Sequence, residues 1–123
     1  MQKAIGIKVV LFQDGTLWVA QCVNHDLASQ GKTLEEAQRN LIRMIVGNVI
    51  LDLQKGIKPL SQYASAPKAF QDIFNQSLML GGGRVKAKSL LKGLRGHASK
   101  VLDPWMIERR IYTKDAKDAC ALH

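Results

Sequence analysis

The sequence has few cysteines, no long apolar run and few acidic residues, and each scarcity disfavours a class of protein. Its two cysteines, Cys22 and Cys120, stand far apart and show no metal-ligand spacing, so a disulfide scaffold and a structural zinc site are disfavoured. No stretch reaches the ~20 apolar residues that a membrane-spanning helix needs, and the N-terminal apolar run is too short for a signal peptide. We therefore expect a cytoplasmic protein with no membrane partner.

Acidic side chains are outnumbered, and the imbalance is uneven along the chain. The 123 residues include 18 lysines and arginines but only 10 aspartates and glutamates, a net charge of +8. Residues 1–76 carry +2 and residues 77–123 carry +6. No acidic residue interrupts the basic positions between 84 and 100, which are Arg84, Lys86, Lys88, Lys92, Arg95 and Lys100. We predict a module over residues 1–80 and a basic C-terminal extension over residues 81–123.

The N-terminal region alternates apolar and polar residues as half-buried strands do. Ile5, Ile7, Val9 and Leu11 share one face of an extended segment, and Asp14-Gly15 follows as a hairpin signal. The next segment, "TLWVAQCV", is rich in β-branched and aromatic residues, and "LASQG" is long enough for a short third strand. The pattern predicts a three-stranded antiparallel meander.

A long helix is predicted to begin after Thr33, which forms a capping box with Glu36, and to end near Lys55, before Gly56. Helical spacing gives this segment two apolar stripes. The first is expected to cover the sheet and contains Leu34, Ala37, Leu41, Met44 and Ile45. The second contains Ile42, Val46, Val49, Ile50 and Leu53.

A small sheet can cover only one side of this helix, so the second stripe needs another cover. One alternative is an oligomer or a protein partner, with the second stripe as the interface. The other is the chain's own C-terminal part, to which a second short helix containing Phe70, Ile73 and Phe74 could contribute. Beyond that helix, three consecutive glycines at 81–83 favour a hinge or turn. The predicted fold is α+β: a small antiparallel sheet of three to four strands packed on one long helix, with a second short helix and the basic extension.

The segment "VAQCVNHDLASQGKTLEEAQRNLIRMI", which follows the strand hairpin, resembles the N-terminal module of HicB-type antitoxin-like proteins. The resemblance covers roughly residues 5 to 55, and the family's helix-start pattern is matched by Gly31, Lys32, Thr33, Leu34, Glu35, Glu36 and Ala37. It implies a partial ribonuclease H-like fold that does not cut nucleic acid, a homodimer or higher oligomer, and a protein partner such as a small RNA-cleaving toxin. The DNA-binding element that the family often carries is not traceable after Leu80.

The triplet Asn24-His25-Asp26 allows two interpretations. An aspartate beside a histidine could orient a general base. Asn and Asp are also typical turn residues, because they bond their own backbone, and we favour this interpretation. The carboxylates are too scattered for a two-metal nuclease, and the three histidines lie far apart. We therefore predict no enzyme activity, no catalytic residue, no metal site and no cofactor.

The basic residues at 84–100 also allow two interpretations. They could neutralise phosphates of DNA or RNA and give a salt-dependent affinity without sequence preference. They could instead form a solvated basic tail without a ligand. The sequence thus favours a non-enzymatic, HicB antitoxin-like interaction module. A small nucleic-acid-binding protein that uses the module only for dimerisation is the alternative.

Overall fold

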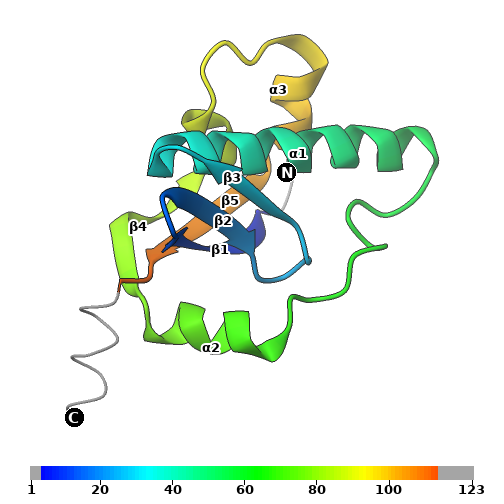
Figure 1. The fold of residues 1–123 in the computed structure, drawn as a ribbon. Helices are drawn as coiled ribbons and strands as arrows, with labels where there is room; N and C mark the ends of the chain where they lie inside the picture. The colour runs from blue at the N-terminus through cyan, green and yellow to red at the C-terminus, as the bar shows by residue number, and fades with distance from the viewer. Residues whose placement is uncertain (1–3, 114–123) are drawn as a thin grey trace.

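The computed structural model describes residues 4–113, except for the side chains of residues 80–82. Within this range the elements are β1 (Ile5–Asp14), β2 (Leu17–Cys22), β3 (Ala28–Gly31), α1 (Leu34–Gln54), α2 (Lys68–Gln76), β4 (Leu78–Lys86), the 3₁₀ helix η1 (Ala87–Leu90), α3 (Gly96–Leu102) and β5 (Trp105–Ile111). The strands form one sheet, and the helices cover both of its sides: α1 and α3 lie on one side and α2 on the other (Figure 1). The α+β class is confirmed. None of the helices in this range has the length and apolarity needed to cross a membrane.

The first three strands form the antiparallel meander that the alternating pattern predicts. Val9 of β1 lies opposite Cys22 of β2, and Trp18 of β2 lies opposite Gly31 of β3. The first hairpin turns at residues 15–16, where Gly15 has a φ of 63° that side chains beyond glycine rarely adopt. The meander places the apolar residues of β1 and β2 beneath α1.

The C-terminal strands complete the same sheet, whose order is β3-β2-β1-β5-β4. β5 is parallel to β1 and antiparallel to β4, so the sheet is mixed and has five strands instead of three or four antiparallel ones. The boundary predicted between residues 80 and 81 falls inside β4. Much of the predicted basic extension therefore belongs to the folded sheet. The glycines expected to form a hinge lie at an irregularity in the β4–β5 pairing between Met79 and Arg84.

Helix α1 begins and ends close to the predicted residues. The Thr33 hydroxyl accepts a hydrogen bond from the backbone N–H of Glu36 at 3.1 Å, which supplies one half of the capping box. The last helical residue is Gln54, and Gly56 beyond it has a φ of 70°. The first stripe packs into the main core as expected, through Leu34, Ala37, Leu41, Met44 and Ile45.

The chain's own C-terminal part covers most of the second stripe. Ile42, Val46 and Val49 are at most 8% exposed, and they share the main core with Leu91, Leu102 and Trp105. This corrects the expectation that these three α1 residues form an oligomer or partner interface, because their surface is already buried inside one subunit. At the end of the stripe, Ile50 is half-buried and Leu53 is 48% exposed.

Helix α2 covers the other side of the sheet. Phe74 is buried with Val10 and Val23 in a second, smaller core, and Phe70 stacks on Phe12 with ring centroids 6.1 Å apart. The aromatic residues of α2 therefore lie across the sheet from α1, and they contribute no cover to its second stripe. That cover comes from η1, α3 and β5, where sequence pattern alone gave weak signals of structure.

Candidate nucleic-acid interface

The structure places the six basic residues at 84–100 on four consecutive segments of the C-terminal half. Two lie in β4, one in η1, two in the η1–α3 connection and one in α3, in the order Arg84, Lys86, Lys88, Lys92, Arg95 and Lys100. All except Lys88 are exposed. Among residues 4–113, Lys88 is the one member of this set that forms an ion pair. Five positive charges thus face solvent without a carboxylate partner in the described chain.

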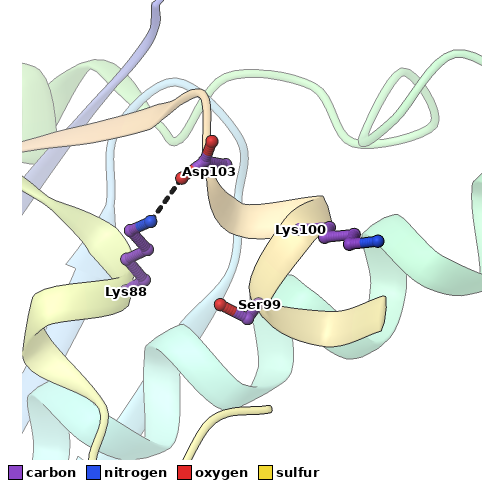
Figure 2. A pocket seen from close by; sticks show the side chains of 4 residues that line it. All are labelled: Lys88, Ser99, Lys100 and Asp103. Atoms are coloured by element: carbon purple, nitrogen blue, oxygen red, sulfur yellow. Dashed lines mark hydrogen bonds and ion pairs between the residues drawn. The ribbon is translucent and has the colours of Figure 1, made fainter. Parts of the chain in front are cut away.

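A polar pocket of about 440 Å³ lies between η1 and α3, lined by Lys88, Ser99, Lys100 and Asp103. Figure 2 shows the Lys88 side chain crossing this pocket, where its ammonium group donates to the Asp103 carboxylate, while Lys100 extends away from Lys88. Ammonium groups and a serine hydroxyl are donors that commonly contact phosphate oxygens. The pocket therefore brings together phosphate-binding groups from two of the basic elements.

Buried apolar residues fix the elements that frame the pocket. Ala87 and Leu91 anchor η1 and the residue after it, and Leu102 anchors the last turn of α3; all three belong to the main core. The hydroxyl of Ser89 donates to the carbonyl of Lys86 at 2.6 Å, which holds the start of η1. The exposed basic side chains thus project from a fixed backbone instead of from an unattached tail.

Asp103 is the acidic member of the pocket, and its charge is held by Lys88. The hydrogen bond from Lys88, followed by the charge of the same ammonium, lowers the pKa of Asp103 below its ordinary value of 3.8. Lys86 lowers this pKa further through its charge. At neutral pH the carboxylate therefore occupies Lys88 and opposes the approach of a phosphate.

The α2 side of the sheet brings Arg84 together with two cations that the sequence analysis did not single out, Lys8 and Arg110. Lys8 of β1 and Arg84 of β4 both lie in register with Glu108 of β5, so the three side chains project from one face. Arg110 forms an ion pair with Glu108 at 3.2 Å, and its guanidinium carbon lies 4.4 Å from the centroid of the Phe74 ring. Only the β1–β5 pairing reveals this group, because it joins residues 100 positions apart.

The triplet Asn24-His25-Asp26 forms the connection between β2 and β3. The Asn24 Oδ1 atom accepts a hydrogen bond from the backbone N–H of Lys8 at 2.5 Å, and the Asp26 Oδ1 atom accepts one from the Gln21 side chain at 3.1 Å. The backbone N–H of Asp26 donates to a carbonyl of the segment after α1. The triplet therefore bonds neighbouring segments as turn residues do, and Asp26 is engaged by Gln21 instead of orienting His25.

Cys22 and the acidic residues were the other candidates for chemistry. Burial raises the pKa of the Cys22 thiol, which keeps it protonated at neutral pH. Over residues 4–113, no three side chains of His, Cys, Asp or Glu gather closely enough to hold a metal ion. Cys120 and His123 lie outside the described residues. The basic surface around η1 and α3 is therefore the strongest candidate site that the structure offers.

Comparison with known proteins leaves this site to be interpreted from its own geometry. The chain matches no family model. It matches no curated protein and no solved structure at a significant level.

Proposed function

We propose that this protein binds nucleic acid through phosphate contacts made by the basic residues of β4, η1 and α3, without catalysing a reaction. Two of these basic side chains, Lys88 and Lys100, line the polar pocket. The hydroxyl of Ser99 adds a neutral donor between them. The proposed ligand is the sugar-phosphate backbone of DNA or RNA, bound without base recognition.

One observation carries the proposal: five exposed cations of β4, α3 and the η1–α3 connection form no ion pair with a carboxylate among the described residues. Like charges held close together repel, so neighbouring unpaired cations destabilise the free protein unless an anion neutralises them. A polyanion releases bound counterions when such a surface neutralises its phosphates, and this release favours binding. The oligomer interpretation lost its main support when Ile42, Val46 and Val49 were found buried.

The test is a salt titration of binding to a labelled DNA duplex and to a single strand of the same length. The logarithm of the binding constant is expected to fall linearly with the logarithm of the salt concentration. Each neutralised phosphate contributes a slope of about −0.9 for a duplex and about −0.7 for a single strand. Replacing Lys92 and Lys100 by Gln should reduce the duplex slope by roughly 1.8. Absence of binding at low salt would overturn the proposal.

The matched control is the double variant Lys32→Gln/Lys68→Gln. It removes the same charge from two exposed lysines, one before α1 and one at the start of α2. Binding at the proposed surface predicts that this control keeps the wild-type slope. If both double variants reduce the slope equally, the protein attracts nucleic acid by its net charge alone. Truncation after Gly83 is unsuitable, because it would remove β5 from the middle of the sheet.

A second candidate is the HicB-like interaction module, as a homodimer or higher oligomer that binds a protein such as a toxin. The strand-strand-strand-helix order of residues 5–54 supports it, as do the exposed side chains of Leu51 and Leu53 near the end of α1. Affinity purification from the native cell, with and without nuclease treatment, separates the two candidates. A small protein recovered in both samples would favour the interaction module, whereas recovery lost on nuclease treatment would favour nucleic-acid binding.

A further inference from the structure

An apolar groove of about 410 Å³ lies beside the polar pocket, between the C-terminal half of α1, the segment after it and the start of β5. This volume falls within the range of about 300–1,000 Å³ that is typical of small-molecule sites. The apolar side chains that line it include Val49, Leu53, Pro59, Val101, Pro104 and Trp105. Such a lining favours the binding of an apolar ligand, because a polar ligand would find few hydrogen-bond partners in it.

The groove has a buried floor and an exposed mouth. Val49 and Trp105 are 1% and 3% exposed, respectively, and they form its floor. Leu53 and Ile5, which also line it, are 48% and 41% exposed. Covering such side chains removes apolar surface from water, which is favourable by about 25 cal/mol per Å². A bound apolar body would therefore gain from the mouth as well as from the floor.

The charged groups that line the groove favour an anion. Among residues 4–113, Lys100 and His97 are the titratable side chains that line it, and no carboxylate of this range does so. Asp103, which lines the polar pocket with Lys100, is bound by Lys88, and the Asp52 carboxylate accepts a hydrogen bond from the backbone of Leu60. A ligand with one negative end would thus place that end toward Lys100, because this lysine lines the otherwise mostly apolar groove.

We propose that the groove binds a small amphipathic carboxylate, with its apolar body against Val49, Leu53 and Trp105 and its carboxylate on Lys100. A second copy of the chain fits less well, because twofold packing of this mouth would bring cations toward each other. A nucleobase fits less well because the apolar walls leave its polar edge unpaired. This inference goes beyond nucleic-acid binding. Since Lys100 also lines the polar pocket, the two ligands would compete for one ammonium if both proposals hold.

The probe for the test is decanoate, kept below the concentration at which it forms micelles. The chain has two tryptophans, so a Trp18→Phe background leaves Trp105 in the groove as the only one. Decanoate is expected to change the Trp105 emission saturably. Leu53→Glu should abolish this change, because it places a negative charge in the mouth. Leu51→Glu is the matched control: Leu51 is 52% exposed on the same helix and does not line the groove, so the change should persist.

A second variant tests the role of the cation. Lys100→Gln is expected to weaken decanoate binding about tenfold or more while leaving the binding of neutral decanol unchanged, as loss of a charge-assisted contact would. Circular dichroism of each variant confirms that it is folded. The proposal is overturned if the emission of Trp105 does not saturate with decanoate, or if Leu51→Glu and Leu53→Glu reduce the emission change equally. It is overturned as well if Lys100→Gln weakens the binding of decanoate and of decanol to the same extent. It is also overturned if Leu53→Glu converts a dimer to a monomer, because a second copy would then occupy the groove. Nucleic-acid affinity enters none of these measurements, so each proposal can fail alone.

Discussion

The Oδ2 atom of Asp52, near the end of α1, accepts a hydrogen bond from the backbone N–H of Leu60 at 2.8 Å. Both residues are buried, and Leu60 has a φ of 62°, a conformation that non-glycine residues rarely adopt. The backbone carbonyl of Asp52 also accepts a hydrogen bond from Ile57. One acidic residue therefore fixes the path of the chain after α1 and directs the Leu60 side chain into the main core.

Replacing Asp52 by Ala should destabilise the fold by about 1–3 kcal/mol, because the buried N–H of Leu60 loses its acceptor. The variant Asp52→Asn keeps an oxygen acceptor of the same shape, so it should lower the free energy of unfolding by less than Asp52→Ala does. Urea unfolding followed by circular dichroism measures both free energies. If both variants lower the free energy of unfolding equally, the negative charge of Asp52 matters more than its hydrogen bond.

Gly31 ends β3 where the chain approaches the start of α1, and no side chain fits there. A Cβ atom at this position would lie 2.4 Å from the backbone nitrogen of Ala37. Gly31→Ala should therefore destabilise the fold by about 1–3 kcal/mol, the usual cost of overpacking. Gly47→Ala is the control, because Gly47 lies on an exposed face of α1 with open space around it; it should stabilise the protein by about 0.5–1 kcal/mol. Thermal unfolding of both variants checks the predicted opposite signs.

Asp103→Asn should raise the affinity for nucleic acid severalfold. The substitution frees Lys88 and removes the carboxylate that, among residues 4–113, lines the polar pocket. Fluorescence anisotropy with the labelled duplex at fixed salt measures the change. Glu35→Gln, which removes a charge from the exposed start of α1, is the control for net charge. An unchanged affinity in Asp103→Asn, or an equal gain in the control, would place the nucleic acid elsewhere.

The same ion pair should make a pH-dependent contribution to stability. Because Lys88 lowers the pKa of Asp103 in the folded state, the pair stabilises the fold above about pH 4, and this contribution is lost as the pH falls through the folded-state pKa. The urea midpoints of the wild type and Asp103→Asn should therefore differ at about pH 6 and converge near pH 2. A difference that persists undiminished in acid would have another origin.

The Cys22 thiol should react with alkylating reagents only when the protein unfolds. Its side chain is buried beneath α1, and burial raises its pKa, so both access and thiolate formation are opposed. In a Cys120→Ser background, alkylation at about pH 8 should be slow and should accelerate across the urea transition. Rapid alkylation in the native state would mean that β2 opens locally.

The sequence predicts the first half of the fold well because its signals are local. The Thr33 cap, the Gly56 stop and the alternation in β1 each depend on residues within one turn or one strand, and each is found. The position of β5 depends instead on a pairing of Ile5 with Trp105, which no local pattern encodes. Gln38 of α1 likewise accepts a 3.0 Å hydrogen bond from Arg109, 71 residues away.

The candidate site shows the same division. All six basic residues of its segment are visible in the sequence, and five of them are exposed. Their framework is not visible, because η1 and α3 are short, glycines lie between them and at the start of α3, and both elements gain their stability from packing on α1. For the same reason, the sequence could not decide between a partner and the chain's own C-terminal part as the cover of the second stripe of α1. That cover comes from a region whose own sequence is weakly patterned.

The place of β5 has a consequence for how the protein is made. During synthesis the ribosome releases β1 to β4 before the strand that separates β1 from β4 exists. Until residue 111 emerges, part of the second apolar stripe of α1 and an unpaired edge of β1 stay available to chaperones or to other nascent chains. Folding of this domain therefore waits for the synthesis of β5, and slow elongation through the codons of β5 would prolong the period in which the domain can aggregate.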